Sequence, residues 1–395
     1  MKLAYVTALF PFAHAEQFFE EEVRSLSRRV EVVVVPVRPP SATPCFDDVG
    51  AALHLPLFSA RVAALAARAA ARAPLRALTT LALIAFDGGS SLRARAVNLA
   101  TFPKALAVAH EVRRLGVDHV HAAWFTTPAS LGWIVARMTG IPFSATAHQH
   151  DIFAHNLAAR KVAAATFVRV ISQRNAEHLR EQLPPALRAR CIVGHLGVAL
   201  PESPAVPPAR GMPRILCAAR LGNWKGHADL LEALALLKTR DVAFACDLAG
   251  DGELRDEVAA TIARLQLGTH VRMLGNVPHP QLVAGLAAGD YDVFALPSTE
   301  QGGQHEGIPV AVMEAMAAGL PVVVTSTGSL TELVEPEHGA LVPQRDPAAL
   351  AQALEKLLLD RDARLRAGAA GRDRIRRDFE TTATTDHLLR LIMSP

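Results

Sequence analysis

The sequence has few cysteines, and none of them is spaced as metal ligands are. Its 395 residues include four cysteines that are scattered along the chain, without the paired spacing of a zinc site. Cys217 and Cys246 lie in apolar runs typical of buried strands, so we expect them to be free thiols. This pattern gives no indication of an oxidising compartment.

Long hydrophobic runs and common nucleotide-binding motifs are also missing. No stretch approaches the roughly 20 uncharged apolar residues that a spanning helix needs. There is no G-x-G-x-x-G after the first strand and no G-x-x-x-x-G-K-[ST], which argues against a dinucleotide oxidoreductase or a P-loop enzyme.

The N-terminal run resembles a signal peptide that ends at Ala13-His14-Ala15. Pro11 interrupts the run, however, and Lys2 is its single basic residue. The same residues are typical of the first buried strand of a parallel sheet. We therefore expect a strand rather than a leader, and a cytoplasmic protein.

Charge is unevenly divided along the chain. Residues 1–200 hold 22 Lys and Arg against 13 Asp and Glu, a formal +9, and residues 201–395 hold 19 against 25, a formal −6. A basic first half suits an anionic acceptor or an anionic membrane surface at the inner face of the membrane. The alternative is an arginine-rich solvated face.

Apolar strand-like runs alternate with helical patterns, which predicts α/β domains with parallel sheets. Five prolines in residues 200–213 indicate a linker. We expect four segments: an acceptor-binding domain over 1–200, a linker over 201–213, a donor-binding domain over 214–375, and a C-terminal helix over 376–395 that returns to the first domain.

An alanine-rich segment over residues 59–86 carries Arg61, Arg68, Arg72 and Arg76. One interpretation is a helical membrane-surface contact. The other is a solvated face of helices packed on the domain, which we favour because no aromatic anchors accompany the arginines.

The strongest motif runs from Glu306 to Val323 and contains two glutamates eight residues apart. Pro309 suits the first position of a helix, and Gly319 with Pro321 suits its end. Glu306 is then held in a loop at a helix N-terminus, whose amides favour an anion such as a diphosphate. The alternative is that Glu306 only caps the helix.

Two further motifs follow predicted strands. Arg220 and Lys225 lie on a strand-to-helix loop and can converge on phosphate oxygens. His148, His150 and Asp151 end a strand of the first half, but are too few and too close for zinc. Thr327-Gly328-Ser329 allows the backbone to approach a ligand closely.

Together these residues resemble retaining glycosyltransferase family 4, with the GT-B fold of two Rossmann-like α/β domains facing each other across a cleft. The similarity covers essentially the whole chain and is greatest to the colanic-acid and exopolysaccharide branch. Its motifs include His119-Val120-His121-Ala122, Thr146 to Ile152, Pro297-Ser298 and the block from Glu306 to Pro321.

The resemblance implies a metal-independent, retaining transfer from a UDP- or GDP-sugar to a carbohydrate or lipid-linked oligosaccharide, with no cofactor and no nucleic-acid partner. Arg220 and Lys225 should hold the diphosphate, Glu306 the sugar hydroxyls and Glu314 the ribose, with His148 near the reacting sugar. The resemblance also assigns two larger sets of residues. The donor-site set adds Gly250, Gly275, Val277, Gly307 and Ile308, and the acceptor or cleft set is His14, Glu16, His150 and Asp151.

The first loop departs from the family pattern, because Phe12 to Glu16 replaces the usual Gly-Gly. Three alternatives stay open. They are another nucleotide-sugar enzyme such as an epimerase, a non-catalytic nucleotide-sugar-binding protein, and a periplasmic binding protein whose N-terminal run is cleaved.

Overall fold

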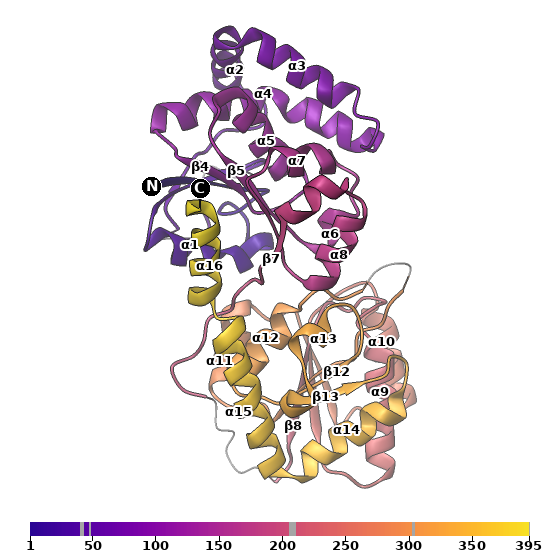
Figure 1. Ribbon diagram of the computed structural model, residues 1–395. Helices are drawn as coiled ribbons and strands as arrows, with labels where there is room; N and C mark the ends of the chain where they lie inside the picture. The colour runs from indigo at the N-terminus through magenta and orange to yellow at the C-terminus, as the bar shows by residue number, and fades with distance from the viewer. Residues whose placement is uncertain (40–42, 47–48, 205–210, 302–304, 395) are drawn as a thin grey trace. The chain divides into compact units, whose positions relative to one another are not determined.

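The chain divides into two compact units, each built on one parallel sheet (Figure 1). In this computed structural model, the described residues are 1–39, 43–46, 49–204, 211–301 and 305–394, and the side chains of residues 14, 15 and 17 lie outside the description. Residues 205–210, which are part of the predicted linker, are therefore not described. Unit 1 comprises Met1–Gly197 and Thr381–Pro395, and unit 2 comprises Val198–Glu380.

Unit 1 has a seven-stranded sheet in the order β3-β2-β1-β4-β5-β6-β7. Its strands are β1 (Lys2–Thr7), β2 (Glu31–Pro36), β3 (Ala51–Ala52), β4 (His119–Ala122), β5 (Phe143–Ala147), β6 (Val168–Val170) and β7 (Cys191–Val193). Its helices are η1 (His14–Phe19), α1 (Glu20–Ser27), α2 (Ala60–Arg72), α3 (Pro74–Ala85), α4 (Leu92–Leu115), α5 (Thr127–Thr139), α6 (Gln149–Ile152), α7 (Ala158–Ala164), α8 (Gln173–Glu181), η2 (Pro185–Arg190) and α16 (Thr381–Met393).

Unit 2 has a six-stranded sheet in the order β10-β9-β8-β11-β12-β13. Its strands are β8 (Arg214–Ala218), β9 (Ala245–Ala249), β10 (Val271–Gly275), β11 (Val293–Leu296), β12 (Val322–Thr325) and β13 (Gly339–Val342). Its helices are α9 (His227–Thr239), α10 (Arg255–Arg264), α11 (His279–Ala287), α12 (Val310–Ala317), α13 (Leu330–Leu333), η3 (Pro336–His338), α14 (Pro347–Leu359) and α15 (Arg361–Asp378).

Solid apolar runs become the central strands because helices cover both faces of each sheet. The four valines Val32 to Val35 of β2 are buried, and so are Val322 to Val324 of β12. The last helix, α16, belongs to unit 1, where it lies beside α1 (Figure 1). Leu388 and Ile392 enter its core, and Asp386 Oδ1 lies 2.7 Å from Arg29 Nε. No helix among the described residues is long and apolar enough to cross a membrane.

One face of the unit 1 sheet carries a chain of buried polar side chains. Arg169 of β6 donates from Nη2 to Glu22 Oε1 of α1 at 2.9 Å and from Nε to Thr146 Oγ1 of β5 at 2.9 Å. The Tyr5 hydroxyl also donates to Glu22 Oε1, at 2.6 Å. Arg169 is fully buried, so its charge depends on Glu22.

We predict that Arg169→Met lowers the free energy of unfolding by roughly 3 to 5 kcal/mol, because it leaves the Glu22 carboxylate buried without its cation. Adding Glu22→Gln should recover part of this loss, because the amide can still accept from Tyr5. Urea denaturation measures both effects. Arg24→Met, which removes a partly exposed ion pair with Glu20, is the matched control and should cost under about 1 kcal/mol. Equal losses for Arg169→Met and Arg24→Met would contradict the prediction.

Candidate functional site

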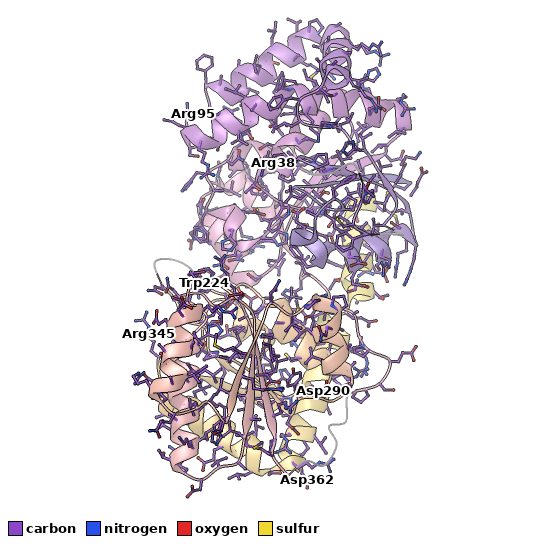
Figure 2. All side chains as sticks on the ribbon, turned by 180° about the vertical axis from the view of Figure 1, so that it is seen from behind. Arg38, Arg95, Trp224, Asp290, Arg345 and Asp362 are labelled. Atoms are coloured by element: carbon purple, nitrogen blue, oxygen red, sulfur yellow. The ribbon has the colours of Figure 1, made fainter. Side chains whose placement is uncertain are left out.

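The predicted donor residues gather at the carboxyl edge of the unit 2 sheet. From β8 the chain proceeds outwards through β9 and β10, and it then returns to β11 on the other side of β8. The loops after β8 and β11 therefore diverge at the place where open α/β sheets bind ligands. Arg220, Trp224 and Lys225 lie on the first of these loops and Glu306 on the second; Trp224 is labelled in Figure 2.

Lys225 and Glu306 meet at this switch point. Lys225 Nζ donates to Glu306 Oε1 at 2.6 Å, and Ser298 Oγ donates to the same oxygen at 2.6 Å. Ser298 directly follows Pro297 after β11, and its carbonyl accepts from the Thr325 hydroxyl of β12. Glu306 is buried, and within the described parts of the chain no group donates to its Oε2. One oxygen is thus fixed, and the other can accept from a ligand hydroxyl.

Two glycines allow the loops around Glu306 to touch. Gly226 has φ +70°, and a Cβ there would lie 1.8 Å from the carbonyl oxygen of Pro297. Gly328 has φ +54°, and a Cβ there would lie 1.8 Å from the carbonyl oxygen of Glu306. The small residues Thr327-Gly328-Ser329 were expected to let the backbone approach a ligand, but the backbone that they approach is that of Glu306. Close packing of three loops holds Glu306.

Arg220 lies at the exposed end of the same edge. Its Nε and Nη2 donate to Glu253 Oε2 at 3.1 and 2.9 Å. Glu253 follows Gly250-Asp251-Gly252 after β9, where Asp251 pairs with Arg255 at 3.0 Å. Exposed pairs of this kind contribute little, so the guanidinium can exchange Glu253 for a phosphate at small cost.

The remaining predicted donor-site residues lie on several elements and loops of unit 2. Glu314 Oε1 of α12 lies 2.5 Å from His279 Nε2 at the start of α11. The Gly250 amide donates to the Gly275 carbonyl at 2.8 Å, which joins the ends of β9 and β10. Val277 and Ile308 are half-buried against the core of unit 2, and Gly307 lies between Glu306 and Ile308. α12 begins at Val310, so Pro309 is its N-cap rather than its first helical residue.

Unit 1 has its own switch point, between β1 and β4. Glu16 links the loops after these two strands. It accepts from the amides of Leu9 and Phe10 at 2.6 and 2.7 Å, and from the indole Nε1 of Trp124. Because Glu16 is buried, the main effect of its carboxylate is to stabilise the conformation of the segment after β1. His14, which was predicted in the same acceptor or cleft set as Glu16, lies in η1, and its side chain is outside the described residues.

His148 lies at the end of β5 against the ring of Trp124, with ring centroids 4.3 Å apart. Its Nε2 donates to the Ala123 carbonyl at 2.9 Å, so the proton is on Nε2 and Nδ1 keeps its lone pair. Burial lowers the pKa of His148 to about 3, with smaller contributions from the positive charge of Arg169 and from His150. His148 is therefore a neutral imidazole at physiological pH.

Asp151 stabilises the segment that carries His148. Its Oδ2 accepts from the amides of Phe125 and His148 at 2.8 and 3.1 Å, and burial raises its pKa to about 7. Lys161 donates to the carbonyls of Phe125 and Thr126 at 2.7 and 2.8 Å. Asp151 therefore shapes the loops after β4 and β5, whereas the side chain of His150 is exposed.

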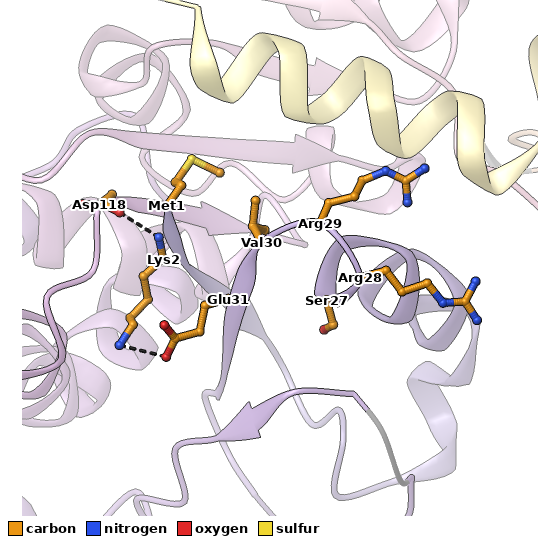
Figure 3. Close-up of a pocket in the computed structure, with 8 residues that line it drawn as sticks. All are labelled: Met1, Lys2, Ser27, Arg28, Arg29, Val30, Glu31 and Asp118. Atoms are coloured by element: carbon orange, nitrogen blue, oxygen red, sulfur yellow. Dashed lines mark hydrogen bonds and ion pairs between the residues drawn. The ribbon is translucent and has the colours of Figure 1, made fainter.

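Two other features are separate from these groups. A shallow cavity of about 620 Å³ lies at the amino ends of β1 and β2, opposite to the edge that carries Glu16, and Lys2 there is paired with Glu31 at 2.8 Å (Figure 3). In the described part of unit 2, Glu335, Glu337 and His338 bring three ligand-type atoms within 4.8 Å of one another. His338 Nδ1 already accepts from the Glu335 amide, at 3.1 Å.

Three residues that contact the predicted ones were not singled out from the sequence. They are Trp124, Glu253 and His279, whereas Ser298 was named only within the Pro297-Ser298 motif and without a role. Trp124 lies two residues after the quoted motif His119-Val120-His121-Ala122, and that position could have drawn attention to it. Glu253 and His279 gave no signal, because their importance depends on which loops meet.

The comparison with known families decides what unit 2 is. Residues 202–374 match the family of glycosyl transferases group 1. These residues form a group 1 glycosyltransferase domain. The match includes Arg220, Lys225, Glu306 and Glu314, and the recognition of this family from its motifs is confirmed.

Relatives and solved structures extend the similarity beyond the group 1 domain. The chain is 37% identical over 212 residues, 52% of each protein, to the colanic acid biosynthesis glycosyltransferase WcaL of Escherichia coli (strain K12). The chain spans about half the length of the curated relatives that it matches.

Several solved structures match almost the whole chain. The glycosyltransferase of Rickettsia africae ESF-5 has a TM-score of 0.71 and 19% identity, covering 99% of this chain and 97% of that one. Anabaena Alr3699/HepE in complex with UDP and glucose has a TM-score of 0.68 and 18% identity, covering 99% and 98%. These matches confirm the predicted GT-B fold class of two Rossmann-like α/β domains.

The low pKa of His148 predicts a specific pH dependence of stability. The unfolded chain takes up a proton at this residue near pH 6.5, and the folded chain only near pH 3, so stability is lost as the pH falls between these values. Between pH 7 and pH 4.5 the loss should be roughly 2 to 3 kcal/mol. His148→Gln should remove this part of the pH dependence, measured by urea denaturation at both pH values. His178→Gln, a partly exposed histidine of unit 1, is the control, and an unchanged slope in His148→Gln would contradict the assignment.

Proposed function

We propose that the protein is a retaining, metal-independent glycosyltransferase that moves a sugar from a nucleoside diphosphate sugar to a carbohydrate or lipid-linked oligosaccharide. The group 1 domain supports transfer chemistry in general. We propose in addition that the donor is a nucleoside diphosphate sugar, that configuration is retained, and that the acceptor is a carbohydrate or lipid-linked oligosaccharide.

The observation that carries the proposal is the 2.6 Å contact between Lys225 and Glu306 at the switch point of the unit 2 sheet. It puts a cation and an acceptor oxygen side by side, as a ligand with a phosphate next to a polyhydroxylated ring requires. Lys225 stabilises the phosphate nearest the sugar. Glu306 Oε2 accepts from sugar hydroxyls, while Ser298 keeps Oε1 in place.

The diphosphate is held without a metal in this proposal. Arg220 leaves Glu253 and joins Lys225 on the phosphate oxygens, and the first amides of α12 face the same anion. These groups stabilise the negative charge that develops on the leaving nucleoside diphosphate. Glu314 and His279 bind the ribose, and the ends of β9 and β10 near Gly250 and Gly275 receive the base. UDP is the first candidate, because UDP is bound to the similarly folded Anabaena protein.

The proposed transfer proceeds on one face of the sugar. The bond between C1 and the phosphate oxygen breaks, and the electron pair stays with the nucleoside diphosphate. The acceptor oxygen forms the new bond to C1 from the same face, and its proton passes to the departing phosphate oxygen. His148 contributes as a neutral hydrogen-bonding group near the sugar, since its low pKa makes it unsuited to donate a proton.

Unit 1 is proposed to bind the acceptor, with Glu16 of η1 and His150 of α6 at the carboxyl edge of its sheet. The similarity to WcaL supports an acceptor in exopolysaccharide assembly. Such acceptors can be carried on a lipid, so we propose that the protein works in the cytoplasm at the inner face of the membrane.

We predict that Glu306→Gln reduces sugar transfer at least about 100-fold, because the neutral amide is a weaker acceptor for hydroxyls and leaves Lys225 unpaired. Release of nucleoside diphosphate from UDP- and GDP-sugars, with and without acceptor, measures transfer. The melting temperature should stay close to that of the wild type. Glu337→Gln, an exposed acid of the same unit, is the matched control. Near-normal turnover by Glu306→Gln would refute the proposed function.

We also predict that Lys225→Ala weakens binding of the preferred nucleoside diphosphate by roughly 10- to 100-fold but leaves binding of the free nucleoside unchanged. Thermal-shift titrations with UDP, GDP and the nucleosides, with and without EDTA, separate these effects. Lys238→Ala, which removes a partly exposed lysine of α9, is the control. Equal losses for nucleotide and nucleoside would show that Lys225 does not contact phosphate, and loss of binding in EDTA would exclude a metal-free site.

A further inference from the structure

Helix α3 of unit 1 is apolar on two opposite sides. Ala77, Thr80 and Ile84 are buried against the domain. Leu75, Leu78 and Phe86 recur on the opposite side of the helix, at spacings of three and eight residues, and are 77%, 64% and 83% exposed. A surface helix normally presents polar residues there, so this outer face requires a partner.

The start of α4 continues the pattern. Leu92 and Leu99 are exposed at a spacing of seven residues, on a helix that packs beside α3 (Figure 1). Of the fifteen large apolar side chains exposed among the described residues, eight lie between Phe58 and Leu99. We call Leu75, Leu78, Phe86, Leu92 and Leu99 the outer face of α3 and α4.

Arginines lie on the same helices as this outer face, and unpaired acids do not. Arg76 lies on α3, and Arg93 and Arg95 lie on α4, with Arg95 half-buried (Figure 2), and the exposed side of α2 carries a further row. That row consists of Arg61, Arg68 and Arg72. Between Asp48 and Glu111 the sequence has a single acidic residue, Asp87. Asp87 is buried, and its Oδ1 lies 2.6 Å from Arg160 Nε.

Aromatic side chains accompany the arginines after all. For residues 59–86 we favoured a solvated face over a membrane contact, because we identified no aromatic anchors beside the arginines. The structure exposes Phe58, directly before α2, by 72%, and Phe86, directly after α3, by 83%. The reason for preferring a solvated face was therefore wrong.

We propose that the outer face of α3 and α4 docks on the surface of an anionic lipid bilayer. Apolar side chains on one side of a surface helix, flanked by arginines, suit insertion below phosphate headgroups. A second copy of the chain is a poorer occupant, because a two-fold interface would bring the arginines of both copies together. This docking surface adds a site to the proposed function but does not depend on sugar transfer.

Vesicle flotation tests the proposal with the full-length protein. Wild-type protein should float with vesicles of equal phosphatidylcholine and phosphatidylglycerol, and should bind pure phosphatidylcholine vesicles much more weakly. Leu78→Ser/Phe86→Ser should weaken binding on the order of tenfold or more, through lost apolar burial. Arg76→Gln/Arg93→Gln should weaken binding to the anionic vesicles by a similar factor at low salt and by less at high salt.

The matched control is Leu359→Ser/Leu365→Ser, which removes two exposed leucines of unit 2 and should bind vesicles like the wild type. UDP thermal shifts and transfer to a water-soluble acceptor should be unchanged in all three variants, so a failure of the proposed function is detected separately. Absence of flotation by the wild type, or flotation of Leu78→Ser/Phe86→Ser at wild-type strength, would overturn the proposal. A dimer in sedimentation equilibrium that Leu78→Ser/Phe86→Ser converts to a monomer would assign the face to self-association instead.

Discussion

The architecture of the proposed donor site depends on one contact, the ion pair between Lys225 and Glu306. The two residues are 81 positions apart, and they meet only because β8 and β11 are neighbours at the switch point of the sheet. Their loops can approach this closely because Gly226 and Gly328 have no Cβ. Burying the Glu306 carboxylate without partners would be unfavourable. Lys225 and Ser298 stabilise the buried carboxylate by donating to it.

This contact also explains why the pair suits a ligand that carries both phosphate and hydroxyl groups. A lysine paired with a carboxylate has less net charge than a free lysine, which limits nonspecific attraction of anions. When a diphosphate approaches, Lys225 can share its three donors between the phosphate and Glu306. In the proposed site the carboxylate then stays anchored by Ser298, and its second oxygen can accept from the hydroxyls of the group that the phosphate carries. Arg220, held only by the exposed Glu253, supplies a movable second cation.

The sequence was sufficient for much of this fold because its signals were local. The predicted alternation of strands and helices is present in both units, each on a parallel sheet, since apolar runs and turn residues determine it. Contacts between distant loops were not predictable in the same way. The pairing of Glu314 with His279 and of Arg220 with Glu253 depends on which loops lie together. Asp151 was expected at the ligand, and yet its carboxylate binds the amides of Phe125 and His148.

The outer face of α3 and α4 was missed for a related reason. Helical periodicity identifies an apolar side, but it does not tell which of two apolar sides is buried. In α3, Ile84 and Leu78 are equally hydrophobic, and only the packing against α4 and α5 separates them. The sequence alone therefore does not show which of the two is exposed. Once the domain has buried one side, the other has no partner among the described residues of unit 1, and the neighbouring positive charge favours an anionic surface.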